Sequence, residues 1–215
     1  MKYIIKQAEP DSFSAWKTLE NEDWQPSFDN LQNPEKRKLK ESLLTEQGYI
    51  CCYCNAQVSE LNSHVEHFKP QCDYPDLNLH YQNLLVPCSV KKQCGDAKAN
   101  WFDSQQTLSP LNADCEQKLR YTDDGHIFPF SHHDSDTDMF INKLNLDDAI
   151  LVKKRREAIK GWLGDDFIVD ATDEDLLKIK NSLNNLKNGK FEPFGFCSSA
   201  TNSIIAIRVG LKDKE

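Results

Sequence analysis

The chain lacks several features that would place it in a membrane or outside the cell. None of its apolar runs is long enough to cross a bilayer, so we expect no membrane span in its 215 residues. Residues 1–7 lack the apolar core and small-residue cleavage site of a secretory signal. We therefore expect a cytoplasmic protein without a membrane partner. No internal repeat is recognisable either.

A basic surplus is also missing. The formal net charge is −8 and the isoelectric point is about 5.3. Proteins that bind nucleic acid alone usually carry a basic patch or stripe, so this balance argues mildly against a stand-alone nucleic-acid binder. If the chain does act on nucleic acid, either local basic patches or a partner's surface must supply the positive charge.

Cysteine, by contrast, is plentiful, with eight residues. A cytoplasm keeps thiols reduced, so closely spaced pairs there indicate metal binding more often than disulfides. The pairs Cys51-x-x-Cys54 and Cys88-x5-Cys94 predict one tetrahedral site for a structural Zn²⁺, with residues 89–93 looped out. The alternative is that some of them are ordinary buried cysteines. The remaining four are interpreted as non-ligands: Cys52, Cys72, Cys115 and Cys197.

A histidine–carboxylate cluster, His64-Val65-Glu66-His67, lies between the two pairs. In an extended strand, His64 and Glu66 would point to one face and His67 to the other. A carboxylate suits Mg²⁺ or Mn²⁺, and an imidazole nearby can take a proton from water near neutral pH. This combination indicates metal-dependent hydrolysis of phosphodiester bonds, although a lone histidine is more often a surface or core residue.

The fold class we expect is α+β, with a small zinc-framed core embedded in mostly helical N- and C-terminal segments. Residues 1–48 form the first segment, with a helix over about 34–47. Residues 49–105 carry the motifs on short strands and loops, followed by a short helix. Residues 106–215 are predicted to be mostly helical and to dock a partner.

Local patterns refine this division. Asn33 can cap the first helix, and Thr172 can cap a later one that continues to Gly189. The polar stretch 102–140 predicts an exposed connection or a mobile arm. Residues 203–211 fit helix or strand, and we favour helix.

The motif residues resemble the HNH endonuclease family. Its ββα-metal motif places an acid-His pair, an Asn-Leu pair and a helix inside a four-cysteine zinc frame. The resemblance implies that His67 is the general base and Glu66 a metal ligand. It also implies that Asn83 orients the loop carrying the base or reaches the metal. The matching stretches are Glu66-His67-Phe68-Lys69-Pro70, Asn83-Leu84 and Cys94-Gly95-Asp96-Ala97-Lys98.

One position departs from many members of that family, which carry His or Asn directly after the last cysteine. Here Gly95 stands there, and Asp96 is the neighbour that can supply the missing ligand. Lys98 matches a helix lysine of the family and is a candidate phosphate contact. Lys91 and Lys92, in the loop before the helix, are further candidates for nucleic-acid contact.

A longer match, from Leu43 to Lys98, resembles the PtuB subfamily of Septu and retron anti-phage systems, whose pattern Gly95 fits. It implies a metal-dependent nuclease effector, a PtuA-like ATPase partner, and a retron reverse transcriptase with its RNA–DNA hybrid. The alternative is a non-catalytic zinc module that binds nucleic acid or a partner protein. A restriction enzyme acting alone is a weaker third reading, because no sequence-reading domain is evident.

Overall fold

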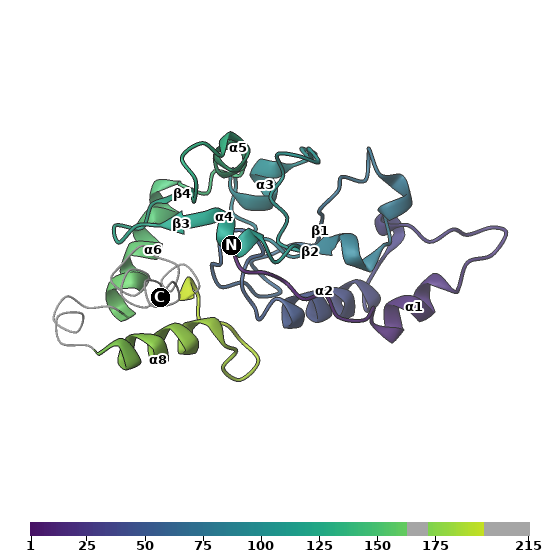
Figure 1. Ribbon diagram of the computed structural model, residues 1–215. Coiled ribbons are helices and arrows are strands. Elements are labelled where there is room, and N and C mark those ends of the chain that lie inside the picture. Colours follow the sequence, from purple (N-terminus) through teal and green to yellow (C-terminus); the bar gives the residue numbers. More distant parts are fainter. Residues whose placement is uncertain (163–171, 196–215) are drawn as a thin grey trace.

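The computed structural model of the chain describes residues 1–162 and 172–195. Helices and two small antiparallel sheets make up this part, the α+β mixture that the sequence predicts (Figure 1). The helices are α1 (Asp11–Lys17), α2 (Glu35–Glu46), α3 (Cys94–Lys98), α4 (Cys115–Lys118), α5 (Ser135–Lys143), α6 (Ala149–Trp162) and α8 (Asp173–Asn184). The strands are β1 (Glu66–His67), β2 (Leu84–Leu85), β3 (Leu119–Tyr121) and β4 (Ile127–Pro129), and 3-10 turns cover Phe28–Asn30, Pro75–Leu77 and Tyr81–Asn83.

Helix α2 supports the first sheet. Its leucines Leu39, Leu43 and Leu44 are fully buried, and Gly48 with φ +58° follows its end. The expected cap was wrong in detail: Pro34 occupies the N-cap position and no side chain caps the helix. Just beyond α2, the Gln47 amide donates to the Val86 carbonyl and accepts from the Val86 N–H, both at 2.8 Å. The helix end is thereby fixed to the chain beside β2.

Strands β1 and β2 pair with Glu66 opposite Leu85 and His67 opposite Leu84. Pairing continues on both sides of this short ladder. The Phe68 N–H donates to the Asn83 carbonyl at one end, and Ser63 bridges to Cys88 at the other. Residues 62–68 and 83–89 therefore form two antiparallel arms, which place Cys88 and the histidine–carboxylate cluster in one register.

The second sheet lies in a stretch that we expected to be an exposed connection, and this expectation was wrong. Strands β3 and β4 pair antiparallel, and their side chains Leu119, Tyr121 and Ile127 are buried. Gly125, with φ +94°, makes the turn between them. Apolar residues spaced two apart on either side of an Asp-Gly pair form a hairpin because each strand can bury one face.

The last helices follow their sequence patterns closely. Thr172 caps α8 through a reciprocal hydrogen-bonded box with Asp175. Helix α8 ends at Asn184, before the predicted Gly189, which has φ +76° and lies between the bridged residues Lys187 and Lys190. The helix favoured for 203–211 lies outside the described residues.

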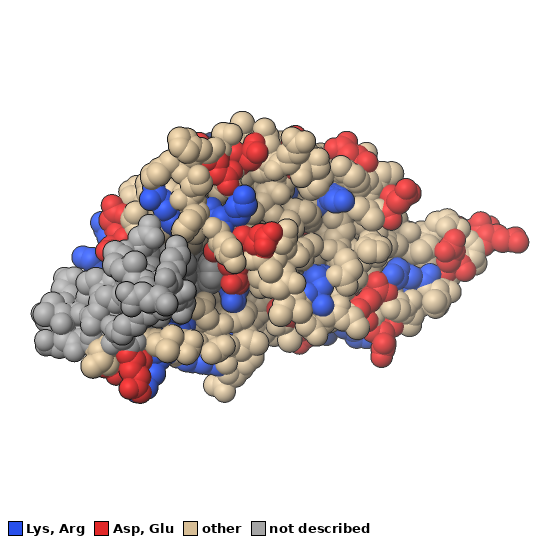
Figure 2. All heavy atoms as spheres, in the orientation of Figure 1, with Lys and Arg blue, Asp and Glu red and all other residues tan. Residues whose placement is uncertain are grey.

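A single hydrophobic core joins the three predicted segments. It contains Leu43 of α2, Tyr53 and Leu84 near the first sheet, and Phe140 and Leu151 of the later helices. None of the helices in the described ranges is both long and apolar enough to span a membrane. On the face in Figure 2, the Lys and Arg residues of the described part are scattered among Asp and Glu rather than gathered in one strip.

Candidate active site

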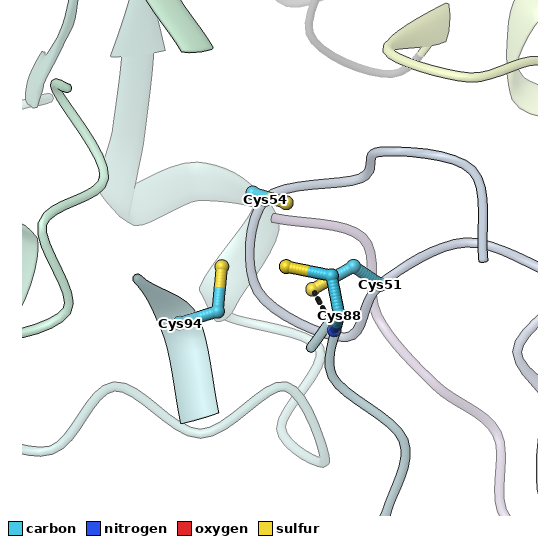
Figure 3. Close-up of side chains that lie close together, drawn as sticks. All are labelled: Cys51, Cys54, Cys88 and Cys94. Carbon is cyan, nitrogen blue, oxygen red and sulfur yellow. Dashed lines mark hydrogen bonds between the residues drawn. The ribbon is translucent and has the colours of Figure 1, made fainter. Parts of the chain in front are cut away.

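Four cysteines converge as the spacing predicted. The Sγ atoms of Cys51, Cys54, Cys88 and Cys94 lie within 4.8 Å of one another, and all four residues are buried (Figure 3). The Cys88 N–H donates to Cys51 Sγ at 3.3 Å, a bond that favours a thiolate. Four sulfur donors around one point suit a tetrahedral metal ion, so this cluster can hold one.

The electrostatics of the cluster favour a bound cation. Burial opposes ionisation of Cys51, but hydrogen bonds from the neighbouring thiols bring its pKa well below the ordinary value. Burial and the charge of Cys51 raise the pKa values of Cys52 and Cys94. One negative charge therefore opposes the ionisation of the next thiol, and a metal ion would relieve this repulsion.

The other described cysteines lie apart from the quartet. Cys52 is buried but does not belong to the converging set. Cys72 is exposed, and Cys115 is buried on α4, where burial raises the pKa of its thiol to about 11. Cys197 lies outside the described residues.

Glu66, on β1, is a buried carboxylate whose two oxygens differ in environment. Oε1 accepts from the Tyr53 hydroxyl at 2.6 Å and lies 3.3 Å from Lys98 Nζ. Oε2 is buried and has no hydrogen-bond partner among the described residues. Burial raises the pKa of the Glu66 carboxyl, while Lys98 and Tyr53 oppose this shift. Such a group costs free energy unless something else binds its second oxygen.

His67 follows on the opposite face of the strand. Its Nε2 lies 2.8 Å from the Asn78 carbonyl oxygen, and its ring meets the Phe28 ring edge-on at 4.7 Å between centroids. A carbonyl can only accept, so Nε2 carries the proton and Nδ1 holds the free lone pair. Burial lowers the pKa of the His67 imidazole, which keeps the ring neutral and able to accept a proton near neutral pH.

Asn83 braces the segment that follows His67. Its Oδ1 accepts from the Lys69 N–H at 2.8 Å, and its Nδ2 donates to the Lys69 carbonyl at 3.0 Å. The amide is buried, so both of these bonds hold the backbone in place without competition from solvent. Asn83 therefore fixes the backbone at Lys69, two residues after His67.

The predicted nucleic-acid contacts divide into two kinds. Lys91 and Lys92 are exposed in the loop before α3. Lys98 is fully buried, with its ammonium near Glu66 Oε1 and 3.3 Å from the His67 carbonyl oxygen. In this structure Lys98 therefore neutralises the carboxylate and presents no donor to a surface phosphate.

Asp96, the predicted third ligand, and His64 lie in different surroundings. Asp96 is exposed, and its Oδ2 accepts from the Lys92 N–H at 2.5 Å. His64, two residues before Glu66 on the same arm, lies on the Glu66 face, as the alternation predicted, although no role was predicted for it. A Cβ atom built on Gly95 would lie 2.1 Å from Glu66 Oε2 and 3.0 Å from His64 Nε2. These two side chains, rather than Asp96, therefore meet beside Gly95.

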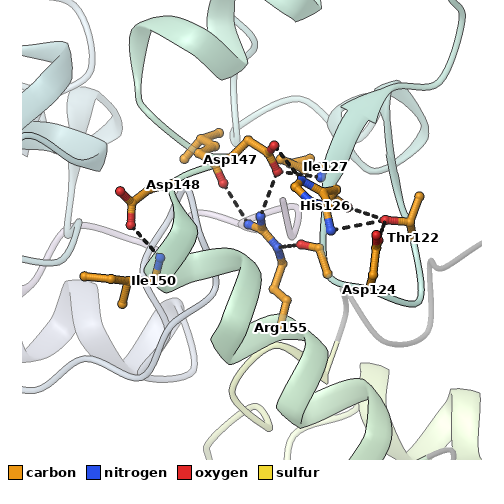
Figure 4. Close-up of polar contacts among 10 residues, drawn as sticks. Thr122, Asp124, His126, Ile127, Asp147, Asp148, Ile150 and Arg155 are labelled. Carbon is orange, nitrogen blue, oxygen red and sulfur yellow. Dashed lines mark hydrogen bonds and ion pairs between the residues drawn. The ribbon is translucent and has the colours of Figure 1, made fainter.

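A second polar cluster lies at the turn between β3 and β4 (Figure 4). Arg155 of α6 is buried there and donates to the carbonyls of Gly125 at 2.6 Å and Leu146 at 2.8 Å. Its third contact is Asp147 Oδ1, at 3.4 Å. Asp147 also accepts from the Ile127 N–H and lies 2.8 Å from His126 Nδ1. The cluster fastens α6 to the hairpin.

Comparison with known proteins supports the resemblance seen in the motifs. The chain is 27% identical over 170 residues to a protein of Vibrio cholerae named as the HNH endonuclease of retron Vc95, covering 73% of this chain and 78% of that protein. It is 29% identical over 136 residues to a protein of Escherichia coli named as the HNH endonuclease of retron Ec83. It is 30% identical over 96 residues to the Septu protein PtuB of Bacillus thuringiensis.

The chain is therefore similar to HNH proteins of retron and Septu systems, at 27% to 30% identity. Its likeness to these HNH proteins covers unequal shares of their lengths: 49% of the Ec83 protein and 36% of PtuB, against 59% and 42% of this chain. No family model matches the chain. The residues that the family resemblance identified from the sequence are Glu66, His67 and Asn83.

Proposed function

We propose that this chain is a metal-dependent HNH endonuclease that hydrolyses phosphodiester bonds in nucleic acid as an effector of anti-phage defence. The observation that carries the proposal is the neighbouring pair Glu66 and His67, braced by Asn83 and Lys98 beside the four-cysteine cluster. The retron and Septu names of the relatives support the same function.

In this proposal His67 is the general base. Its Nδ1 lone pair accepts a proton from the water that attacks phosphorus, while the bond from Nε2 to the Asn78 carbonyl fixes the ring. Asn83 holds the Lys69 backbone and so limits the motion of the segment that carries His67. The base is thus oriented before the substrate arrives, which lowers the entropic cost of reaction.

Two metal ions have separate places. The four cysteines hold a structural Zn²⁺, since their buried sulfur atoms fit a tetrahedral ion. Glu66 Oε2 is the donor for Mg²⁺ or Mn²⁺, because it is buried and lacks another partner in the described part of the chain. When bound, that ion supplies charge stabilisation to the phosphate and the leaving oxygen. We assign β1, β2 and α3 to the ββα unit that surrounds it.

Substrate and partners complete the proposal. Lys91 and Lys92 are exposed and can contact backbone phosphates near the site. Because the chain is acidic overall, we propose that a partner adds further positive surface. We propose a PtuA-like ATPase for this role, with a retron reverse transcriptase and its RNA–DNA hybrid as further components, and the region after residue 106 as the docking surface.

The test is His67→Ala, assayed in the chain together with its partners against DNA and RNA pools in Mg²⁺, and for phage protection in cells. Loss of the base should lower cleavage by at least about 100-fold and abolish protection. His133→Ala is the matched control, because His133 is exposed and lies outside the site. If folded, assembled His67→Ala still protects, the chain is better described as a non-catalytic zinc module.

A further inference from the structure

We infer that His64 is the second protein ligand of the divalent ion held by Glu66, in the role predicted for Asp96. This inference rests on the proposed nuclease function for its purpose, but the geometry stands on its own. Both donor atoms face one point beside Gly95: Glu66 Oε2 within 2.1 Å and His64 Nε2 within 3.0 Å of where a Cβ would lie.

The carboxylate supplies the first independent support. Glu66 is 9% exposed, and its Oε2 has no hydrogen-bond partner in the described part of the chain. Its other oxygen is already bound by Tyr53 and paired with Lys98. A buried carboxylate oxygen without a hydrogen-bond partner, close to the same point as an imidazole nitrogen, is an arrangement expected of metal ligands.

The tautomer of His64 supplies the second support. Its Nδ1 lies 3.2 Å from the Ser89 hydroxyl on the opposite arm of the sheet. If Nδ1–H donates to this hydroxyl, Nε2 keeps its lone pair, and that is the atom facing Gly95. Histidines that bind metals usually donate their other N–H in this way, which fixes the ring for the metal.

The absence of a side chain at Gly95 lets Glu66 and His64 lie close to helix α3. A side chain there would also meet the Pro87 ring at 2.6 Å, so only glycine lets β1, β2 and α3 come this close. Asp96, one residue later, is exposed and bonds the Lys92 N–H instead. In this proposal Gly95, which follows Cys94, is small because the ligand His64 comes from the arm 62–68 and needs the space beside it.

The chemistry of the two ligands, Glu66 and His64, also indicates which divalent ion would bind more tightly. One carboxylate and one imidazole leave most positions of an octahedral ion to water and phosphate oxygens, as is usual for Mg²⁺ and Mn²⁺ in nucleotide chemistry. Imidazole suits transition metals better than Mg²⁺. We therefore expect Mn²⁺ to bind more tightly than Mg²⁺.

The experiment measures Mn²⁺ affinity by electron paramagnetic resonance on zinc-loaded full-length chain. The variants His64→Gln and Glu66→Gln should each weaken Mn²⁺ binding by at least about tenfold. His133→Gln, on an exposed histidine, should bind as the wild type does. Zinc content and the melting temperature, measured on the same samples, report whether the cysteine cluster and the fold are intact.

A second variant tests the role of His64 without replacing that residue, in case His64→Gln fails to fold. Ser89→Ala keeps His64 but removes the hydroxyl that orients it, and it should weaken Mn²⁺ binding by about tenfold with zinc content unchanged. Wild-type affinity in both His64→Gln and Ser89→Ala, with affinity lost in Glu66→Gln, would overturn the role of His64. An unmodified chain that fails to bind Mn²⁺ would also overturn it. If Mn²⁺ binds through His64 but nucleic acid stays intact, the metal site holds and the nuclease proposal fails.

Discussion

Two buried charged side chains, Glu66 on β1 and Arg155 on α6, differ in how far the protein satisfies their hydrogen bonds. Arg155 is 1% exposed, and its guanidinium reaches two backbone carbonyls and the Asp147 carboxylate. Glu66 is nearly as buried, yet only one of its oxygens is bound within the described residues. The protein satisfies the hydrogen bonds of Arg155 with its own atoms, whereas the Oε2 atom of Glu66 has no partner among the described residues.

This difference indicates a structural role for Arg155 and a functional role for Glu66. A satisfied buried cation rigidifies the packing of a helix on a hairpin and needs nothing from outside the chain. A carboxylate that lacks a partner is costly unless a bound ion completes it, so such groups gather at functional sites. The cysteine quartet resembles the second pattern, since burial and the charge of Cys51 raise the pKa of Cys94, and a bound metal ion would relieve this repulsion.

The largest effect should come from the cysteine frame. Structural zinc contributes about 10–16 kcal/mol of binding free energy in zinc-finger peptides, so Cys54→Ser should unfold the motif region. We expect zinc content by elemental analysis and the melting temperature to fall together. Cys72→Ser is the matched control, because Cys72 is exposed and apart from the quartet. Unchanged zinc in Cys54→Ser would exclude Cys54 as a ligand.

Arg155→Met should have the next largest effect, on stability alone. The carbonyls of Gly125 and Leu146 would each lose this donor, at about 1–3 kcal/mol apiece, so unfolding should become easier by about 3 kcal/mol. Urea denaturation measures this loss. Lys154→Met, at the exposed neighbouring position, is the control. A loss of Mn²⁺ affinity in folded Arg155→Met would break the comparison, because it would make the arginine cluster part of the metal site.

A pair of glycines gives the smallest and most selective change. A Cβ at Gly95 would collide with Glu66 Oε2 and Pro87, whereas one at Gly161 meets nothing within 4 Å. Gly95→Ala should cost about 1–3 kcal/mol and weaken Mn²⁺ binding, while Gly161→Ala should stabilise α6 by about 0.5–1 kcal/mol. Thermal unfolding and Mn²⁺ titration of both variants test this. Equal metal affinity in the two would show that the space beside Gly95 is not used.

The sequence predicted the parts of the site that depend on local spacing. Cys-x-x-Cys places two sulfurs on one turn whatever the rest of the chain does, and a strand sets His64 and Glu66 on one face. The burial of Lys98 could not be predicted, because lysine is rarely buried and only the folded chain brings Glu66 to it. The same holds for Arg155, because nothing in the basic run 153–156 distinguishes it from its neighbours.

The hairpin of β3 and β4 was missed for a different reason. Its signal, Asp124-Gly125 between alternating apolar residues, is present in the sequence but is set within a long polar stretch. Asp96 was preferred as a ligand because it follows Gly95 directly, whereas the loop conformation turns it toward the Lys92 backbone.

The paired arms 62–68 and 83–89 also limit how this chain can tolerate insertions and deletions. Side chains alternate between faces, so one residue added in the first arm before Glu66 would exchange the faces of Glu66 and His67. Two added residues would restore the faces but shift the arm by about 6.6 Å relative to Cys88. The connection over residues 70–80 closes the two arms outside the ladder, so length changes should be confined to its part before Asn78, whose carbonyl orients His67.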